Sequence, residues 1–160
     1  MTTDATLVEE QYCTFWVSGL FFGVAVAEVQ EVLRTQPMTP VPRAADAVTG
    51  LINLRGQIVT AVDLRVRLGF PPRDPATAPM NVIVRSRGEV VSLLVDDIGD
   101  VIDLAEIGGV APEPVPSNMP ARVQDVVSGV RPLAGSILLV LDADRAVDVS
   151  SAPDTAGGKP

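Results

Sequence analysis

Short runs of apolar and β-branched residues alternate with glycine-containing turns along most of the chain. Such runs are typical of strands, and a glycine turn between two of them is typical of a β-hairpin. Hairpin turns are expected at Ser18-Gly19-Leu20, Arg55-Gly56 and Ser86-Arg87-Gly88-Glu89. The strands that we expect cover residues 12–17, 21–26, 51–54, 57–62, 82–85, 90–95, 98–104, 126–130 and 136–141. Strands at this spacing favour a mainly β fold, either a small barrel or a sandwich.

Departures from the strand pattern mark short helices and boundaries. Aspartates begin the segments 63–68 and 142–147, and an aspartate at that position is typical of the residue that caps a short helix. The segment 27–33 is compatible with a short helix or with a bent strand. Proline-rich stretches at 71–79 and 112–120 resist continuous helix or strand and are natural boundaries.

The chain also repeats itself. Residues 48–63 align without a gap with residues 127–142, at an offset of 79 positions. Identical residues at matched positions are Val48 and Val127, Gly50 and Gly129, Leu54 and Leu133, Gly56 and Gly135, Ile58 and Ile137, and Asp63 and Asp142. A weaker match relates residues 23–32 to 92–101 at an offset of 69. Strand-rich sequences also align by chance, but matched glycines indicate matched backbone geometry, so we interpret the pattern as a duplicated unit.

Composition narrows the range of functions. Apolar residues make up 47% of the 160 residues, enough for a buried core, and only 4% are aromatic. The sequence has no histidine, which excludes histidine-based acid–base catalysis and histidine-ligated metal sites. A net charge of −8 is a poor match for the phosphate backbone of nucleic acids. No apolar stretch is long enough to span a bilayer, and the chain has a single cysteine, Cys13. We therefore expect a cytoplasmic soluble protein with Cys13 in its core.

Two places carry candidate chemistry. Asp96 and Asp97, with Asp100 nearby, are candidates for a metal site or for acid–base work. Neighbouring residues on an extended chain point to opposite faces, and no histidine or lysine accompanies them, so a solvated bend is the favoured interpretation. The sequence therefore predicts no enzyme and no cofactor.

The second candidate for a functional role is Arg55, which lies at the tip of a turn between apolar strands. A turn arginine is usually only solvated, but its planar fork also binds carboxylates at interfaces. Glu31 is a plausible partner, either within the molecule or across an interface.

The segments around these residues resemble the CheW family, the adaptor proteins of bacterial chemosensory arrays. The resemblance rests on Val29-Gln30-Glu31-Val32, on Val48-Thr49-Gly50-Leu51-Ile52-Asn53-Leu54-Arg55-Gly56, and on Val62-Asp63-Leu64-Arg65. It implies a mainly β domain at residues 11–148 with two intertwined, SH3-like, five-stranded barrel subdomains, short helices and a linker near 71–79. Residues 1–10 and 149–160 are expected to be flexible tails.

The resemblance also implies a function. It predicts a non-catalytic cytoplasmic adaptor that couples the signalling tips of chemoreceptors to the regulatory domain of the chemotaxis histidine kinase. The alternatives are a CheW-like scaffold of a non-flagellar chemosensory system, such as one for twitching motility or development, an enzyme that uses its carboxylates, and an SH3-like peptide-binding module. The last would need an aromatic-lined groove that six aromatic residues hardly furnish.

The resemblance implies partner-binding residues in two groups. Positions implicated in receptor or kinase contact are Val29, Glu31, Gly50, Asn53, Arg55 and Gly56. Ile98 and Val101 match positions in an apolar groove between the subdomains, where a receptor helix would lay its hydrophobic face.

Overall fold

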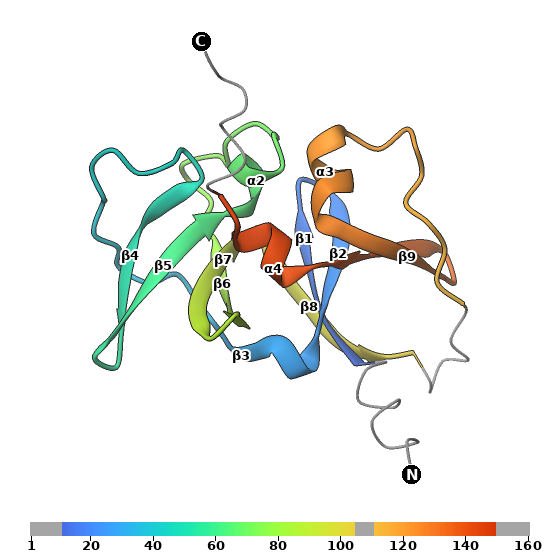
Figure 1. The fold of residues 1–160 in the computed structure, drawn as a ribbon, viewed down its shortest axis with the longest axis horizontal. Coiled ribbons are helices and arrows are strands. Elements are labelled where there is room, and N and C mark those ends of the chain that lie inside the picture. The colour runs from blue at the N-terminus through green and yellow to red at the C-terminus, as the bar shows by residue number, and fades with distance from the viewer. Residues whose placement is uncertain (1–10, 105–110, 150–160) are drawn as a thin grey trace.

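The structure is a computed structural model that describes residues 11–104 and 111–149 (Figure 1). Of the tails expected at 1–10 and 149–160, residues 1–10 and 150–160 lie outside the described residues. Within them the elements are β1 (Gln11–Val17), β2 (Leu20–Ala25), the 3-10 helix η1 (Val26–Glu28), β3 (Val29–Leu33), β4 (Val48–Leu54), β5 (Gln57–Asp63), α2 (Leu64–Arg67), β6 (Met80–Ser86), β7 (Glu89–Val95), β8 (Asp97–Asp103), α3 (Ala121–Val126), β9 (Val127–Leu133), β10 (Ser136–Leu141) and α4 (Ala143–Val147). The mainly β fold is confirmed.

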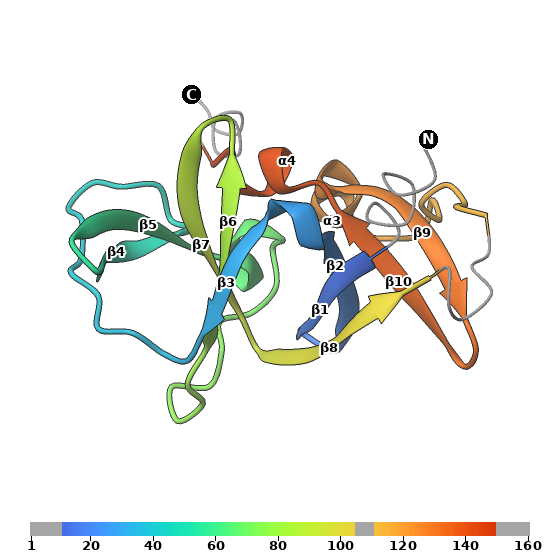
Figure 2. The same cartoon turned by 90° about the horizontal axis from the view of Figure 1, so that it is seen from below.

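The strands form two five-stranded sheets that lie side by side (Figures 1 and 2). Sheet A has the order β8-β1-β2-β10-β9, and sheet B has the order β3-β6-β7-β5-β4. Strands β2 and β10 pair in parallel in sheet A, as β5 and β7 do in sheet B. Each position in one sheet thus has a counterpart in the other, which the repeat in the sequence predicts.

Each half of the chain is shared between the two sheets. Strands β1 and β2 belong to sheet A and β3 to β5 to sheet B, whereas β6 and β7 belong to sheet B and β8 to β10 to sheet A. The offset of 79 relates the β4–β5 and β9–β10 hairpins, and the offset of 69 relates β2–β3 to β7–β8. The chain therefore crosses between sheets twice, and the expected intertwining of the two subdomains is confirmed.

Matched glycines have matched surroundings. Gly56 and Gly135 both adopt positive φ, 89° and 79°, in the turns of the two related hairpins. A Cβ on Gly50 would lie 2.7 Å from the carbonyl oxygen of Thr39, and one on Gly129 would lie 3.3 Å from that of Glu113. These carbonyls belong to the segments that follow the crossover strands, and each segment bridges to the far edge of its sheet, at Thr39–Leu51 and Glu113–Val130. Each bridge thus joins the segment that follows the first strand of a sheet to the last strand of the same sheet, as in a small barrel.

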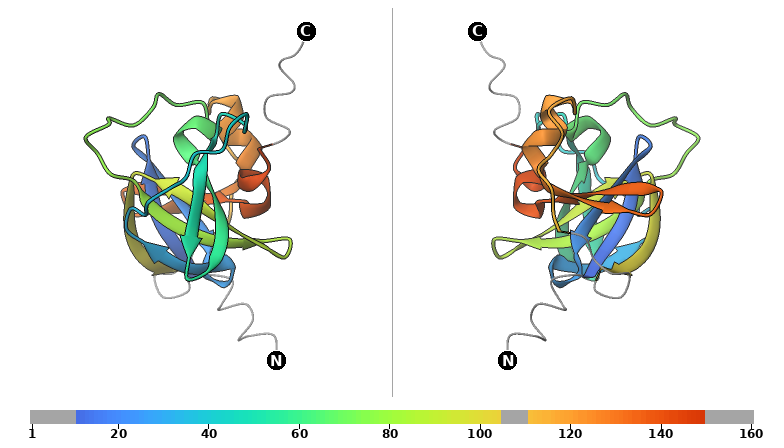
Figure 3. Two further views of the ribbon diagram at one scale, coloured as in Figure 1. Left: turned by 90° about the vertical axis from the view of Figure 1, so that its left-hand side faces the viewer. Right: turned by 90° about the vertical axis from the view of Figure 1, so that its right-hand side faces the viewer.

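The helices are short and lie near the ends of strands. Asp63 and Asp142 cap α2 and α4, as predicted, and the ambiguous segment 27–33 combines the end of η1 with β3. Helix α3 is absent from the sequence prediction, which starts a strand at residue 126 where the structure starts β9 at Val127. The proline-rich stretch 71–79 connects α2 to β6 and extends away from the sheets (Figure 3).

The core is built from valine, leucine and isoleucine. The largest cluster takes buried residues from both sheets, including Phe15 and Phe22 of sheet A and Val84 and Leu93 of sheet B. Two smaller clusters each belong to a single sheet. Cys13 is buried, as expected, and burial raises the pKa of its thiol. No helix in the described part of the chain is long and apolar enough to cross a membrane.

Candidate functional site

The turn between β4 and β5 presents a guanidinium group to solvent. Arg55 and Gly56 occupy the two central positions, with φ of 53° and 89°, which is the backbone of a tight hairpin turn. Asn53 stiffens this turn, because its Oδ1 accepts a hydrogen bond of 2.8 Å from the backbone N–H of Gly56. The Arg55 side chain is 66% exposed. Asn53, Arg55 and Gly56 are therefore brought together as one structural unit.

Arg55 forms an ion pair with Glu31, in which its Nη2 donates to Oε2 of the carboxylate. The pairing that the sequence suggested is confirmed, and it is intramolecular. Glu31 lies on β3, at the opposite edge of sheet B from β4, so the pair joins the two edges of the sheet. The Glu31 side chain is only 23% exposed. The pair holds a solvent-facing cation in a defined place, which is what recognition of an acidic or hydrogen-bond-accepting partner requires.

The two remaining residues of the first group, Gly50 and Val29, pack inside sheet B. Gly50 is buried on β4 against the backbone of Thr39, where a side chain has no room. Val29 is half-buried on β3, packs against the core and pairs with Val84 of β6. Their part in partner binding stays a prediction.

The second group lies on the other sheet. Ile98 and Val101 both belong to β8 at the edge of sheet A. Val101 is 62% exposed, whereas Ile98 is half-buried and packs against the core. The structure thus divides the candidate residues between the two sheets, with a polar group at the β4–β5 turn and an apolar group on β8.

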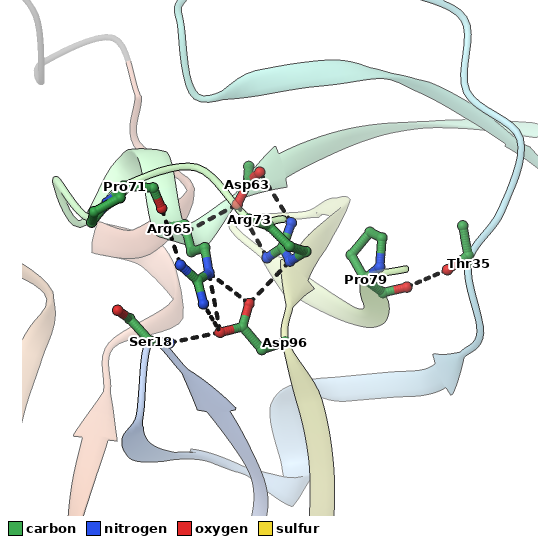
Figure 4. A network of polar contacts seen from close by, with 8 residues as sticks. All are labelled: Ser18, Thr35, Asp63, Arg65, Pro71, Arg73, Pro79 and Asp96. Atoms are coloured by element: carbon green, nitrogen blue, oxygen red, sulfur yellow. Dashed lines mark hydrogen bonds and ion pairs between the residues drawn. The ribbon is translucent and has the colours of Figure 1, made fainter. Parts of the chain in front are cut away.

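Sequence reasoning missed a cluster of charged residues between the sheets (Figure 4). Asp96 stands at the crossover from β7 to β8, and its carboxylate accepts hydrogen bonds from Arg65 at 2.9 and 2.8 Å, Arg73 at 3.0 Å, and the Ser18 backbone N–H at 2.7 Å. Arg73 also bonds to Asp63 at 3.2 Å. Asp96 forms the expected bend between two strands, but the prediction that it is solvated is wrong, because its side chain is only 17% exposed and has two arginine partners. Asp97 is exposed and points elsewhere, as expected for neighbours in extended chain.

The electrostatics of Asp96 reflect these contacts. Burial by itself raises the pKa of a carboxyl group, but hydrogen bonds from Arg65, Ser18 and Arg73 outweigh burial here, so the pKa of Asp96 lies below its ordinary value. A sequence signal for this cluster is weak, since the partners of Asp96 lie 23 to 78 positions away.

Comparisons with known proteins agree with the geometry. The family model described as a CheW-like domain matches residues 11–150. Chemotaxis protein CheW of Bacillus subtilis is 30% identical over 153 residues, which cover 92% of this chain and 95% of that protein. Chemotaxis protein CheW of Rhizobium meliloti is 28% identical over 81% of this chain and 82% of that protein. The probable chemotaxis protein CheW of Rhizobium etli is 31% identical over 98 residues, a match that spans 63% of that protein.

A solved structure shares the fold. The crystal structure of the scaffolding protein TtCheW from Thermoanaerobacter tengcongensis superposes with a TM-score of 0.71, covers 83% of this chain and 88% of that protein, and is 24% identical in sequence. The family model covers nearly the whole described domain, and the Bacillus relative matches over almost its full length. The chain therefore belongs to the family of CheW-like domains.

Proposed function

We propose that this chain is a non-catalytic adaptor that couples chemoreceptor signalling tips to the regulatory domain of the chemotaxis histidine kinase in the cytoplasm. The observation that carries the proposal is the match to the CheW-like domain along residues 11–150. The relatives support it, because they are named chemotaxis proteins and the solved structure is of a scaffolding protein.

The arrangement of the candidate residues suits a protein with two partners. Arg55 and Glu31 offer a charged, directional contact on sheet B, and Val101 with Ile98 offers an apolar contact on sheet A. A guanidinium fork selects carboxylates and carbonyl oxygens, whereas an apolar strand face suits the hydrophobic side of a helix. Two contacts of different chemistry on two sheets allow two different proteins to bind at once.

The work of such an adaptor is geometric. It holds the kinase domain beside the receptor, so that a small movement of the receptor changes the population of active kinase. The candidate groups are binding groups: a paired arginine, a turn amide and apolar side chains. None of them needs to change its covalent state for the adaptor to act.

The proposal is tested by co-purification of the full chain with a receptor signalling-tip fragment and with the kinase regulatory domain. The variant Arg55→Glu reverses the charge at the β4–β5 turn. Arg87→Glu is a matched control, because Arg87 occupies the same turn position in the β6–β7 hairpin, with φ of 52° and a side chain that is 73% exposed. Circular dichroism of each variant confirms that it is folded.

We expect the wild type to bind both fragments, Arg55→Glu to lose one of them, and Arg87→Glu to keep both. Loss of the same fragment by both variants would assign the effect to net charge rather than to the Arg55 site. A wild type that binds neither fragment would contradict the proposed coupling role and leave the fold unaffected.

A further inference from the structure

Asp96 lies at the point where the chain passes from sheet B to sheet A. It follows β7, which ends at Val95, and directly precedes β8, which carries Ile98 and Val101. Its backbone N–H donates to the Trp16 carbonyl at 2.9 Å, and its side chain accepts from the Ser18 backbone. Asp96 is therefore attached to the β1–β2 hairpin of sheet A through both its backbone and its side chain.

The other contacts of Asp96 lead into sheet B. Arg65 lies on α2, directly after β5, and donates hydrogen bonds to the Asp96 carboxylate from two nitrogens (Figure 4). Arg73 bonds to Asp96 and to Asp63, the last residue of β5, and is only 8% exposed. Because β5 begins directly after the Arg55–Gly56 turn, one strand and one set of ion pairs connect that turn to the start of β8.

The same contacts fasten the proline-rich loop. Arg65 also donates to the Pro71 carbonyl at 3.1 Å, and the Thr35 hydroxyl donates to the Pro79 carbonyl. The loop 71–79 is thus held at both ends, with Arg73 directed inward to the cluster (Figure 4). Such fixation keeps Arg73 in place as a partner of Asp96.

The crossover from β2 to β3 is built differently from the one between β7 and β8. The offset of 69 places the uncharged Ala27 where the β7–β8 crossover has Asp96. The next residue, Glu28, has a raised pKa because of burial and of the nearby carboxylates of Asp144 and Asp142. Asp144, which the offset of 79 matches to Arg65, instead contacts the β6–β7 turn through Ser86. At the β7–β8 crossover two largely buried arginines bind one carboxylate, whereas the carboxylates of Asp144 and Asp142, near the β2–β3 crossover, pair with the exposed Arg87 and Arg145 at 3.9 and 3.6 Å.

We propose that Asp96 is a positioning residue that fixes β8 against sheet B and thereby sets the spacing between the Ile98–Val101 surface and the Arg55–Glu31 site. The inference rests on the proposed function for its meaning in signalling, but the spacing itself is a property of the fold. An adaptor that holds two partners transmits movement only if its two binding surfaces keep a defined separation. The β7–β8 crossover is then the rigid connection between the two sheets.

The spacing can be measured directly in the full chain. Spin labels at Gln57→Cys, beside the Arg55 turn, and Asp100→Cys, on β8, report the distance across this connection in a Cys13→Ala background. Both labelled positions are exposed.

The variants are Asp96→Asn, which removes the carboxylate charge, and Asp96→Glu, which keeps it. Asp144→Asn is the matched control, because it removes a carboxylate near the β2–β3 crossover. Arg65→Lys is a milder change that keeps the positive charge but loses the hydrogen bonds from two nitrogens.

We expect Asp96→Asn and Arg65→Lys to broaden or shift the distance distribution, Asp96→Glu to restore part of the wild-type distribution, and Asp144→Asn to leave it unchanged. In unlabelled protein, Asp96→Asn should weaken simultaneous binding of the receptor and kinase fragments about tenfold, and binding of either one alone less than about threefold.

Unchanged distances in folded Asp96→Asn and Arg65→Lys would overturn the positioning role, whatever the partners do. If Asp96→Asn fails to fold, Arg65→Lys decides the question. Altered distances in a protein that binds neither fragment would support the positioning role and contradict only the proposed function.

Discussion

Asp63 and Asp142, 79 positions apart, perform the same task at the ends of related strands. Each stands where the second strand of a hairpin meets a short helix, Asp63 as the last residue of β5 and Asp142 directly after β10. Each carboxylate accepts a hydrogen bond from a backbone N–H of that helix, that of Arg65 at 2.9 Å and that of Arg145 at 3.2 Å. They differ in their other partners. Asp63 also binds the buried guanidinium of Arg73, whereas Asp142 pairs with the exposed Arg145 at 3.6 Å.

This difference predicts unequal costs of removing the two caps. Asp142→Ala should lower the free energy of unfolding by about 1 kcal/mol, the usual value of an N-cap. Asp63→Ala should cost about 2 kcal/mol or more, since it also removes a partner of a buried arginine. Urea unfolding of both variants gives the comparison. Equal losses would show that the Asp63–Arg73 contact contributes nothing to stability.

Stability should depend on pH through Asp96. Its pKa is below the ordinary value in the folded protein, so the ionised carboxylate contributes stability that is complete above the unfolded-state pKa, about 3.9. That contribution is lost as the pH falls from there through the lower folded-state pKa. Asp96→Asn should therefore cost about 2 kcal/mol at neutral pH and progressively less below about pH 4. Urea unfolding of both proteins from pH 7 downward checks this. A difference that does not shrink in acid would mean that the carboxylate charge is not what stabilises the cluster.

The Arg55 turn allows stability and binding to be separated. Arg55 adopts a left-handed backbone that asparagine accepts more readily, so Arg55→Asn relieves the turn while it removes an exposed ion pair. The two effects should cancel to within about 0.5 kcal/mol, whereas affinity for one partner should fall at least tenfold, the loss of about 1.4 kcal/mol of binding energy. Arg87→Asn makes the same change of residue in the β6–β7 turn and should leave binding intact. Thermal unfolding and titration calorimetry measure the two effects, and parallel losses of stability and binding in Arg55→Asn would count against a contact role.

Gly50 and Gly129 should respond differently to alanine. The added Cβ would meet a backbone oxygen at 2.7 Å at Gly50 but at 3.3 Å at Gly129. Gly50→Ala should cost about 2 kcal/mol through displaced backbone, and Gly129→Ala should be close to neutral, because the reduced freedom of the unfolded chain offsets about 0.4–1 kcal/mol. The denaturant midpoints of Gly50→Ala and Gly129→Ala show which variant is less stable. If Gly50→Ala is as stable as the wild type but binds no partner, Gly50 is a contact residue rather than a structural one.

Val101 offers a test of the apolar surface. Its side chain is 62% exposed, so Val101→Asp should change stability little but place a charge where the proposed receptor helix lies. We expect affinity for the receptor fragment to fall at least tenfold, about 1.4 kcal/mol, with kinase binding unchanged. Val101→Thr keeps the branched shape and is the control. Fluorescence anisotropy with a labelled receptor fragment measures the effect, and normal affinity in Val101→Asp would exclude β8 from that contact.

The sequence carries the local features of this fold well. Glycine turns, helix-capping aspartates and alternating strands depend on neighbouring residues, and the repeat shows which of them correspond. Helix α3 was missed because its single apolar pair, Val123 and Val126, follows a proline-rich stretch that suggests a loop. The pairing of Arg55 with Glu31 follows from the chemistry of a turn arginine, whose planar fork binds carboxylates, but the sequence leaves open whether the pair forms within the molecule or across an interface.

The Asp96 cluster could not be predicted in the same way. Arg65, Arg73 and Ser18 reach Asp96 from three different segments, and nothing local distinguishes an aspartate with two arginine partners from a solvated one. Only the passage of β7 into the other sheet brings these groups together. Contacts that depend on how the strands are arranged in the sheets cannot be predicted from the pattern of residues along the chain.

The sharing of each half of the chain between the two sheets has a consequence for synthesis. On the ribosome, β1 and β2 emerge first, but the strands that complete their sheet, β8 to β10, emerge last. Sheet B can assemble once β7 has been made, whereas the apolar faces of β1 and β2 must wait through most of translation. We therefore expect the nascent chain to fold in two stages, with the N-terminal hairpin as the segment that chaperones protect in the interval.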